Sequence, residues 1–260
     1  MSIERPIRIA VQLQPQHSPD YALMRDAVLR AEDTGVDIIF NWDHFYPLNG
    51  DLDGAHFECW TMLGAWAEQT ERVEIGALVT GGGYRNPDLL ADMARTVDHL
   101  SGGRAILGIG AGWFQRDFDE YGYDFGTPPS RLGALEASLK RIRARLERLS
   151  PPPLGDLPIL VGGAGEKVTL RLVATYADMW NTFGPAEAFA AKNRVLDGWC
   201  ARVGRDPAEI ERTVLIMDTR DIRNVDAYLD AGAQHLILGA GPPFDLEPLR
   251  ALIARRDKGP

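Results

Sequence analysis

Short runs rich in β-branched residues alternate with longer amphipathic segments along most of the chain, and this alternation limits the fold more than any other feature. It is typical of repeated strand–helix units that build a parallel sheet. Eight runs are expected to form strands, at 7–13, 36–40, 73–79, 105–110, 158–161, 178–181, 213–217 and 234–238. Eight helical segments are expected to follow them, at 20–34, 57–70, 87–100, 130–149, 166–176, 185–203, 225–231 and 247–256.

Eight such units predict an α/β fold of the closed (β/α)8 type, a TIM barrel, as a single domain over residues 1–260. A doubly wound open sheet usually needs fewer units and a glycine-rich nucleotide turn after its first strand, whereas the first run here continues into Gln14-Pro15-Gln16. The proline-rich stretch 150–158 could link two domains. Because strand–helix alternation resumes directly after it, we interpret it as a helix-to-strand connection. Pro87 and Ser130 are expected at helix starts.

The charge balance argues against nucleic acid or an anionic membrane surface as a partner, because 37 acidic residues outweigh 28 basic ones and the net charge is −9. Cys59 and Cys200 form no CxxC pair, and the histidines show no HxH or HExxH grouping, so no disulfide scaffold and no metal site are expected. The N-terminal run contains charges and lacks the pattern of a signal peptide, and no stretch has the ~18 apolar residues of a membrane span. These features predict a cytoplasmic protein that acts on a small molecule.

Chemically active side chains follow several of the expected strands, which is where (β/α)8 barrels build their active sites. Asp43-His44 follows the second run and joins a carboxylate to an imidazole that can move a proton near neutral pH. A structural histidine held by hydrogen bonds would give the same pair. The aromatic side chains of Trp42, Tyr46 and Trp113 could wall a pocket or pack as core.

A glycine-rich turn, Gly162-Gly163-Ala164-Gly165, follows the fifth run and opens a helix. Unpaired backbone N–H groups at such a position can hold a phosphate, and Lys167 and Thr169 could add a charge and a hydroxyl. The glycines could equally serve only the backbone angles of a turn. Since neither this turn nor Gly108-Ile109-Gly110-Ala111-Gly112-Trp113 satisfies GxGxxG, a Rossmann-type NAD site is disfavoured.

In this order, the motifs resemble the luciferase-like monooxygenase superfamily, in particular its branch that uses the deazaflavin coenzyme F420. The resemblance runs from Ile7 to about Gly239 and rests on segments 43–45, 76–80 with 84–87, 101–113, 158–167 and 177–181. It implies a (β/α)8 barrel, commonly a homodimer, with the coenzyme across the strand mouths. Other members of the superfamily use FMN, which remains the alternative cofactor.

The resemblance also implies roles for individual residues. Asp43 would contact the deazaflavin ring, Ala77-Leu78 would form a bulge behind it, often with a non-prolyl cis peptide, and Thr80 would reach its polar edge. His44 would be the general acid or base, with Asp43 tuning or orienting it, and Tyr46 and Trp113 would border the substrate. Two further groups complete the site, one lining the other side of the ring and one serving the phosphate: Gly110, Ala111 and Gly112, and Gly162, Gly163, Gly165, Lys167 and Thr169.

These features predict an F420-dependent oxidoreductase that transfers a hydride between the deazaflavin and a small organic substrate. The alternatives are an FMN-dependent monooxygenase and a catalytically silent flavin- or deazaflavin-binding protein. A Schiff-base aldolase is disfavoured because Lys167 is the only lysine near an expected strand mouth. Leu48 and Trp113 depart from the sugar-phosphate dehydrogenases of this superfamily, so oxidation of a sugar phosphate is not expected.

Overall fold

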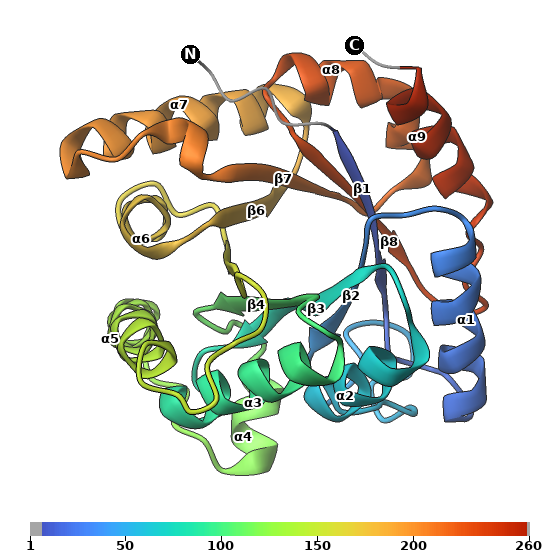
Figure 1. Ribbon diagram of the computed structural model, residues 1–260, viewed down its shortest axis with the longest axis horizontal. Coiled ribbons are helices and arrows are strands. Elements are labelled where there is room, and N and C mark those ends of the chain that lie inside the picture. The colour runs from blue at the N-terminus through green and yellow to red at the C-terminus, as the bar shows by residue number, and fades with distance from the viewer. Residues whose placement is uncertain (1–6, 259–260) are drawn as a thin grey trace.

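The computed structural model describes residues 7–258, and in it eight parallel strands close into a barrel in chain order, with β8 pairing with β1 (Figure 1). This confirms the predicted (β/α)8 fold, and every expected run overlaps a strand. The strands are β1 (Arg8–Leu13), β2 (Ile38–Asp43), β3 (Glu74–Gly81), β4 (Ala105–Gly110), β5 (Ile159–Gly162), β6 (Met179–Phe183), β7 (Glu211–Ile216) and β8 (His235–Ala240).

The helices lie outside the barrel and follow the strands around it (Figure 1). None of those within residues 7–258 is long and apolar enough to cross a bilayer. They are α1 (Tyr21–Asp33), α2 (Cys59–Gln69), α3 (Pro87–Leu100), α4 (Gln115–Tyr121), α5 (Pro128–Leu146), α6 (Thr169–Tyr176), α7 (Ala186–Val203), α8 (Val225–Asp230) and α9 (Glu247–Asp257), with 3-10 turns η1 (Pro207–Glu209) and η2 (Thr219–Asn224).

The core has two layers because both faces of each strand are covered, as is usual for parallel sheets. One cluster of buried side chains fills the space between the strands and the helices. A second, smaller cluster fills the inside of the barrel and includes Ala10, Phe40, Leu160 and Ile237. This packing explains why the strands show near-continuous apolar runs in the sequence.

The starts of α5 and α6 differ from those expected. Thr127 is the N-cap of α5, and Ser130 takes part as its reciprocal partner in a capping box, so the expectation that Ser130 itself caps the helix is wrong. Proline is favoured in the first turn of a helix because no partner is needed there for its missing N–H, which lets Pro128 start the helix. Helix α6 begins at Thr169 rather than at residue 166.

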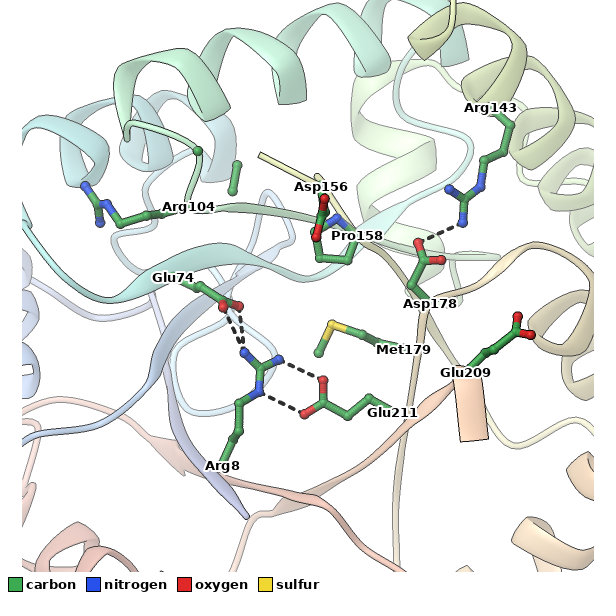
Figure 2. Close-up of a pocket in the computed structure, with 12 residues that line it drawn as sticks. Arg8, Glu74, Arg104, Arg143, Asp156, Pro158, Asp178, Met179, Glu209 and Glu211 are labelled. Carbon is green, nitrogen blue, oxygen red and sulfur yellow. Dashed lines mark hydrogen bonds and ion pairs between the residues drawn. The ribbon is translucent and has the colours of Figure 1, made fainter. Parts of the chain in front are cut away.

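At the end of the barrel where the strands begin, ionic contacts join neighbouring segments (Figure 2). Arg8 donates to Glu74 at 2.9 Å and to Glu211 at 2.8 Å, so one guanidinium joins the first residues of β1, β3 and β7. The proline-rich stretch connects α5 with β5, and Asp98 of α3 accepts hydrogen bonds from the N–H groups of Leu154 and Gly155. The stretch is therefore a connection that is tied to the barrel.

Candidate active site

A cavity of about 450 Å³ opens where the strands end, and side chains from β1 to β7 and the loops after them line it. The structure thus brings together loops that the sequence places far apart. Eleven of the fifteen residues to which the resemblance gives a role line this cavity, as does Trp42: Asp43, His44, Leu78, Thr80, Gly110, Ala111, Gly112, Trp113, Gly162, Gly163 and Thr169.

Four other residues that the sequence singled out do not line the cavity. Ala77 is fully buried in the layer between the strands and the helices. Tyr46 lies beneath the guanidinium of Arg116, 4.0 Å from the ring centre. Gly165 and Lys167 are exposed on the loop that leads from β5 into α6.

The third strand bulges within the expected segment, but its cis peptide lies one bond later than the sequence suggested. The pairing register shifts between Gly76 and Thr80, a stretch that contains Ala77 and Leu78, and the non-prolyl cis peptide joins Leu78 to Val79 rather than Ala77 to Leu78. Gln12 of β1 donates to the carbonyl oxygen of Leu78 at 2.6 Å, although β1 pairs with β2 and β8 and not with β3. The expected place of the bulge is therefore consistent with the structure, and the expected cis bond was wrong by one residue.

Glycines on two other strands make room for this bulge. A Cβ on Gly110 would lie 2.9 Å from the Val79 side chain, and one on Gly162 would lie 3.1 Å from it. Such contacts are shorter than ordinary packing allows, so the side chain of Val79 lies in space that glycine leaves free on β4 and β5. Val79 itself lines the cavity and forms part of its floor.

His44 is held by a buried carboxylate from α4. Its Nδ1 lies 2.7 Å from Oδ2 of Asp117, a side chain with no exposed surface. Asp117 also accepts hydrogen bonds from the Tyr84 hydroxyl at 2.8 Å and from the backbone N–H of Phe45 at 3.0 Å. A carboxylate that receives three such contacts acts as the acceptor, so Nδ1 carries the proton and Nε2 is left for the cavity.

Asp43 is bound by Arg85 rather than by His44. The guanidinium of Arg85 donates to both carboxylate oxygens, at 2.5 and 3.2 Å, and its other contact is Glu58 at 2.5 Å. Burial raises the pKa of Asp43, and the charge of Arg85 opposes that rise. The expectation that Asp43 orients His44 is wrong, because its oxygens are directed to Arg85 and the orienting carboxylate is Asp117.

Aromatic rings surround His44. Trp113 and Phe114 each lie 5.7 Å from it, and Trp42 lies 5.9 Å away, measured between ring centres. The Trp42 indole N–H donates a hydrogen bond to His56, so it is not available as a donor to the His44 ring. The His44 ring is therefore bordered mainly by aromatic surface.

Asp117 and the apolar residues Phe183 and Met217 are parts of the site that the sequence reasoning did not single out. Phe183 is the last residue of β6 and Met217 directly follows β7, and neither belongs to a distinctive motif. A signal for Asp117 did exist: the segment Gln115–Tyr121 is polar except for Phe118 and Tyr121, and in a helix Asp117 lies beside Phe118 at its buried side. The segment is too short to show helical periodicity.

A second hollow, of about 600 Å³, lies at the other end of the barrel, where the strands begin (Figure 2). Its charged side chains are largely paired with one another, as Arg8 is with Glu74 and Glu211, and Arg143 with Asp178 at 2.7 Å. In (β/α)8 barrels this end serves stability, whereas chemistry occurs at the other. We therefore assign the candidate site to the smaller cavity.

The family model for luciferase-like monooxygenases matches residues 5–237. The chain belongs to the luciferase-like monooxygenase family. This is a family of enzymes, and the resemblance stated from the sequence is confirmed. Groups of three His, Cys, Asp or Glu side chains that could hold a metal ion do not occur in the part of the chain that the structure describes.

Curated relatives include proteins named as an F420-dependent oxidoreductase, a ketoreductase and a pyrimidine monooxygenase. A Mycobacterium kansasii protein named phthiodiolone/phenolphthiodiolone dimycocerosates ketoreductase is 33% identical over 68% of this chain and 54% of its own length. A Mycobacterium tuberculosis protein named as a coenzyme F420-dependent oxidoreductase is 29% identical over 75% of this chain and 62% of its own. Pyrimidine monooxygenase RutA of Stutzerimonas stutzeri is 26% identical over 80% and 64%. The chain thus spans between half and two thirds of these relatives.

Solved structures share the fold. An F420-dependent secondary alcohol dehydrogenase, in complex with an F420–acetone adduct, superposes with a TM-score of 0.84 at 18% identity, covering 95% of this chain and 97% of that one. The coenzyme F420-dependent tetrahydromethanopterin reductase of Methanopyrus kandleri superposes with a TM-score of 0.75 at 17% identity, covering 96% and 98%. At these identities the likeness establishes the luciferase-like barrel.

Proposed function

We propose that this chain is an F420-dependent oxidoreductase that reduces a carbonyl group or oxidises the matching alcohol, with His44 as the general acid or base. The observation that carries this proposal is the His44–Asp117 pair at the edge of a cavity floored by the β3 bulge. When bound, the deazaflavin would accept or supply the hydride. The protein would supply orientation and the proton.

The residues of the cavity fit a deazaflavin. Val79 and Leu78 offer apolar surface to a ring, and Gly110 and Gly162, which also line the cavity, leave the room that the Val79 side chain occupies. Thr80 accepts from the Trp60 indole at 2.9 Å, which leaves its hydroxyl hydrogen for a polar edge atom. Asp43, Ala111 and Gly112 would complete the surroundings of the ring.

The phosphate would lie at the start of α6. Gly162, Gly163 and Thr169 line the cavity there, and within residues 7–258 the backbone N–H groups of Gly165 and Lys167 donate no hydrogen bond. Free N–H groups ahead of a helix favour an anion. The exposed Lys167 could follow the tail outward into solvent.

His44 would accept a proton when an alcohol is oxidised and donate one when a carbonyl group is reduced. With Nδ1–H held by Asp117, its neutral ring presents Nε2 as a base toward an alcohol, and its protonated ring presents Nε2–H as an acid toward a carbonyl oxygen. Asp117 would hold the ring in this orientation and favour the protonated form when it arises. A Schiff-base mechanism is not supported, because no lysine in the described residues lines the cavity.

The first experiment separates F420 from FMN. Oxidised F420 and FMN are titrated separately into the purified chain, and binding is followed by cofactor fluorescence. We expect F420 to bind at least tenfold more tightly. A preference for FMN would replace our proposal with the monooxygenase alternative, which the similarity to RutA also favours.

The second experiment separates an enzyme from a silent binding protein. His44→Ala removes the proton-transfer group without adding bulk, so cofactor affinity should change less than threefold while turnover falls about 10²- to 10⁴-fold. The readout is the rate at which bound F420 changes redox state with a ketone or an alcohol. An unchanged rate in the variant would remove His44 from the mechanism.

A further inference from the structure

We infer that the substrate of this site is an uncharged molecule with an extended apolar body that packs against Trp113, Phe183 and Met217. This inference concerns the substrate class of the proposed function and rests on it. The charge of the cavity, the exposure of these three side chains and the shape of the adjoining surface point to it independently.

Three large apolar side chains around the cavity are unusually exposed. The exposed fractions are 64% for Trp113, 73% for Phe183 and 53% for Met217, and all three line the cavity. They come from the loop after β4, from the end of β6 and from the residue after β7. Apolar groups gathered from separate elements around one opening are typical of a binding surface, since exposing them to water is unfavourable.

The cavity has no cationic side chain to balance a negative charge on a substrate. Within residues 7–258, no arginine or lysine lines it. The guanidinium groups that touch its lining residues are already bonded: Arg85 to Asp43 and Glu58, and Arg131 to the carbonyl oxygens of Gly112 and Phe125. A carboxylate or phosphate on the substrate would lose its hydration without gaining a cation, which is strongly unfavourable.

The apolar surface continues out of the cavity. Phe183, Leu215 and Met217 also line a neighbouring hollow of about 490 Å³ between the segments that follow β6 and β7. Carboxylates of Glu187 and Asp221 border that hollow, with Asp218, which is paired with Arg220. Acidic groups at the outer end would repel an anionic tail, so they support the same choice of substrate.

The reacting end of the substrate must lie close to Trp113. This indole is 5.7 Å from the His44 ring between ring centres, so a carbonyl oxygen within reach of Nε2 would place the neighbouring carbon atoms against it. From there, the body of the substrate can extend over Phe183 and Met217. A compact polar sugar would leave these side chains uncovered.

The test compares two ketones of equal length, 2-decanone and 9-oxodecanoate, which differ only in the terminal carboxylate. Binding to the F420-loaded chain is measured by calorimetry, and the rate of ketone reduction is measured with the reduced coenzyme. We expect 2-decanone to bind at least a hundredfold more tightly. In the series 2-butanone, 2-hexanone and 2-decanone, affinity should rise by up to about fourfold for each methylene that becomes buried.

A charge change provides the matched control. Met217→Arg places a cation beside the proposed position of the substrate's body. It should lower the ratio of the affinity for 2-decanone to that for 9-oxodecanoate at least tenfold. Leu154→Arg makes the same change at a side chain that is 61% exposed and does not line the cavity, so it should leave the preference unchanged. Equal or tighter binding of the keto acid to the parent chain, or affinities that do not rise with chain length, would overturn the inference. Binding with the expected preference but without reduction would contradict the proposed reaction and leave the substrate class standing.

Discussion

His44 can act on a substrate through Nε2 because its other nitrogen is already bonded inside the protein. Asp117 holds Nδ1, and Tyr84 and the Phe45 N–H hold Asp117 in turn. Burial, followed by the nearby charge of Asp117, raises the pKa of Tyr84, so this hydroxyl remains a donor. At the scale of single residues, the proposed function depends on three hydrogen bonds that all end on the Asp117 carboxylate.

Replacing Asp117 by Asn should therefore slow turnover without removing the catalytic group. The amide can accept two of the three contacts at most, so the His44 ring should be held less well, and we expect kcat to fall about 10- to 100-fold. F420 affinity should change little.

Asp119→Asn is the matched control, since Asp119 lies on the same helix but is exposed. It should leave kcat unchanged. Equal losses in the two variants would mean that α4 only supports the fold.

At the scale of elements, the bulge of β3 depends on the absence of side chains on the strands beside it. Gly110 and Gly162 leave room for Val79, and Gly108 leaves room for the backbone. A Cβ on Gly108 would lie 1.9 Å from the carbonyl oxygen of Ala77. Flexible side chains can rotate away from such a contact, whereas a backbone carbonyl in the middle of a sheet cannot.

Gly108→Ala should consequently destabilise the chain strongly, by about 3 kcal/mol or more in the free energy of unfolding, in line with overpacked cores. Gly198→Ala is the control, because Gly198 lies in α7 and a Cβ there meets nothing within 4 Å. That variant should gain up to about 1 kcal/mol from helix propensity. Urea denaturation measures both, and a Gly108→Ala chain as stable as the parent would contradict the packing.

At the scale of the whole molecule, the candidate active site and the ion pairs around Arg8 lie at opposite ends of the barrel. The cavity lies where the strands end, and the Arg8 cluster lies where they begin (Figure 2). Although burial opposes it, contact with Glu211 and Glu74 raises the pKa of Arg8, so the guanidinium stays charged. The two ends should respond separately to mutation.

Arg8→Met should lower stability and leave cofactor binding unchanged. The variant leaves two carboxylates without the cation that pairs with them. The side chain of Glu211 is 7% exposed, and that of Glu74 is 37% exposed and partly screened by water. We expect a loss of roughly 1–3 kcal/mol, less than for a fully buried pair. Adding Glu211→Gln should recover part of it. A change in F420 affinity of more than threefold in folded Arg8→Met would contradict the separation.

Acid should destabilise the molecule through two histidines. Burial, together with the charge of His44, lowers the pKa of His56 to about 4, and burial lowers the pKa of His235 well below its usual value. Below pH 6.5 the unfolded chain binds protons that the folded chain does not, so each histidine reduces the unfolding free energy by up to about 1.4 kcal/mol per pH unit. For His56 the loss should extend down to about pH 4.

His56→Gln tests this, because its amide oxygen can still accept the Trp42 indole N–H now bonded to His56. Between pH 6.5 and 4, the unfolding free energy of the variant should fall less steeply than that of the parent. Equal slopes would mean that His56 takes up its proton in the folded chain as well.

The sequence by itself determined the barrel, its eight units and most of the residues around the cavity. Strand runs and helical periodicity are local patterns, and in a closed parallel barrel the ends of all strands meet at one rim. The sequence therefore predicts that Asp43, His44 and the glycines of β4 and β5 meet at one opening, and these residues do line one cavity.

Only the tertiary structure decided which side chains bond to one another. Asp43 precedes His44 in the chain, yet it is bonded to Arg85, 42 residues away, while His44 is bonded to Asp117, 73 residues away. Nearness in sequence does not bring two side chains into contact, because successive side chains along an extended backbone point in different directions. The exact site of the β3 bulge and the exposure of Phe183 and Met217 likewise depend on packing between strands that are distant in sequence, for which no local pattern exists.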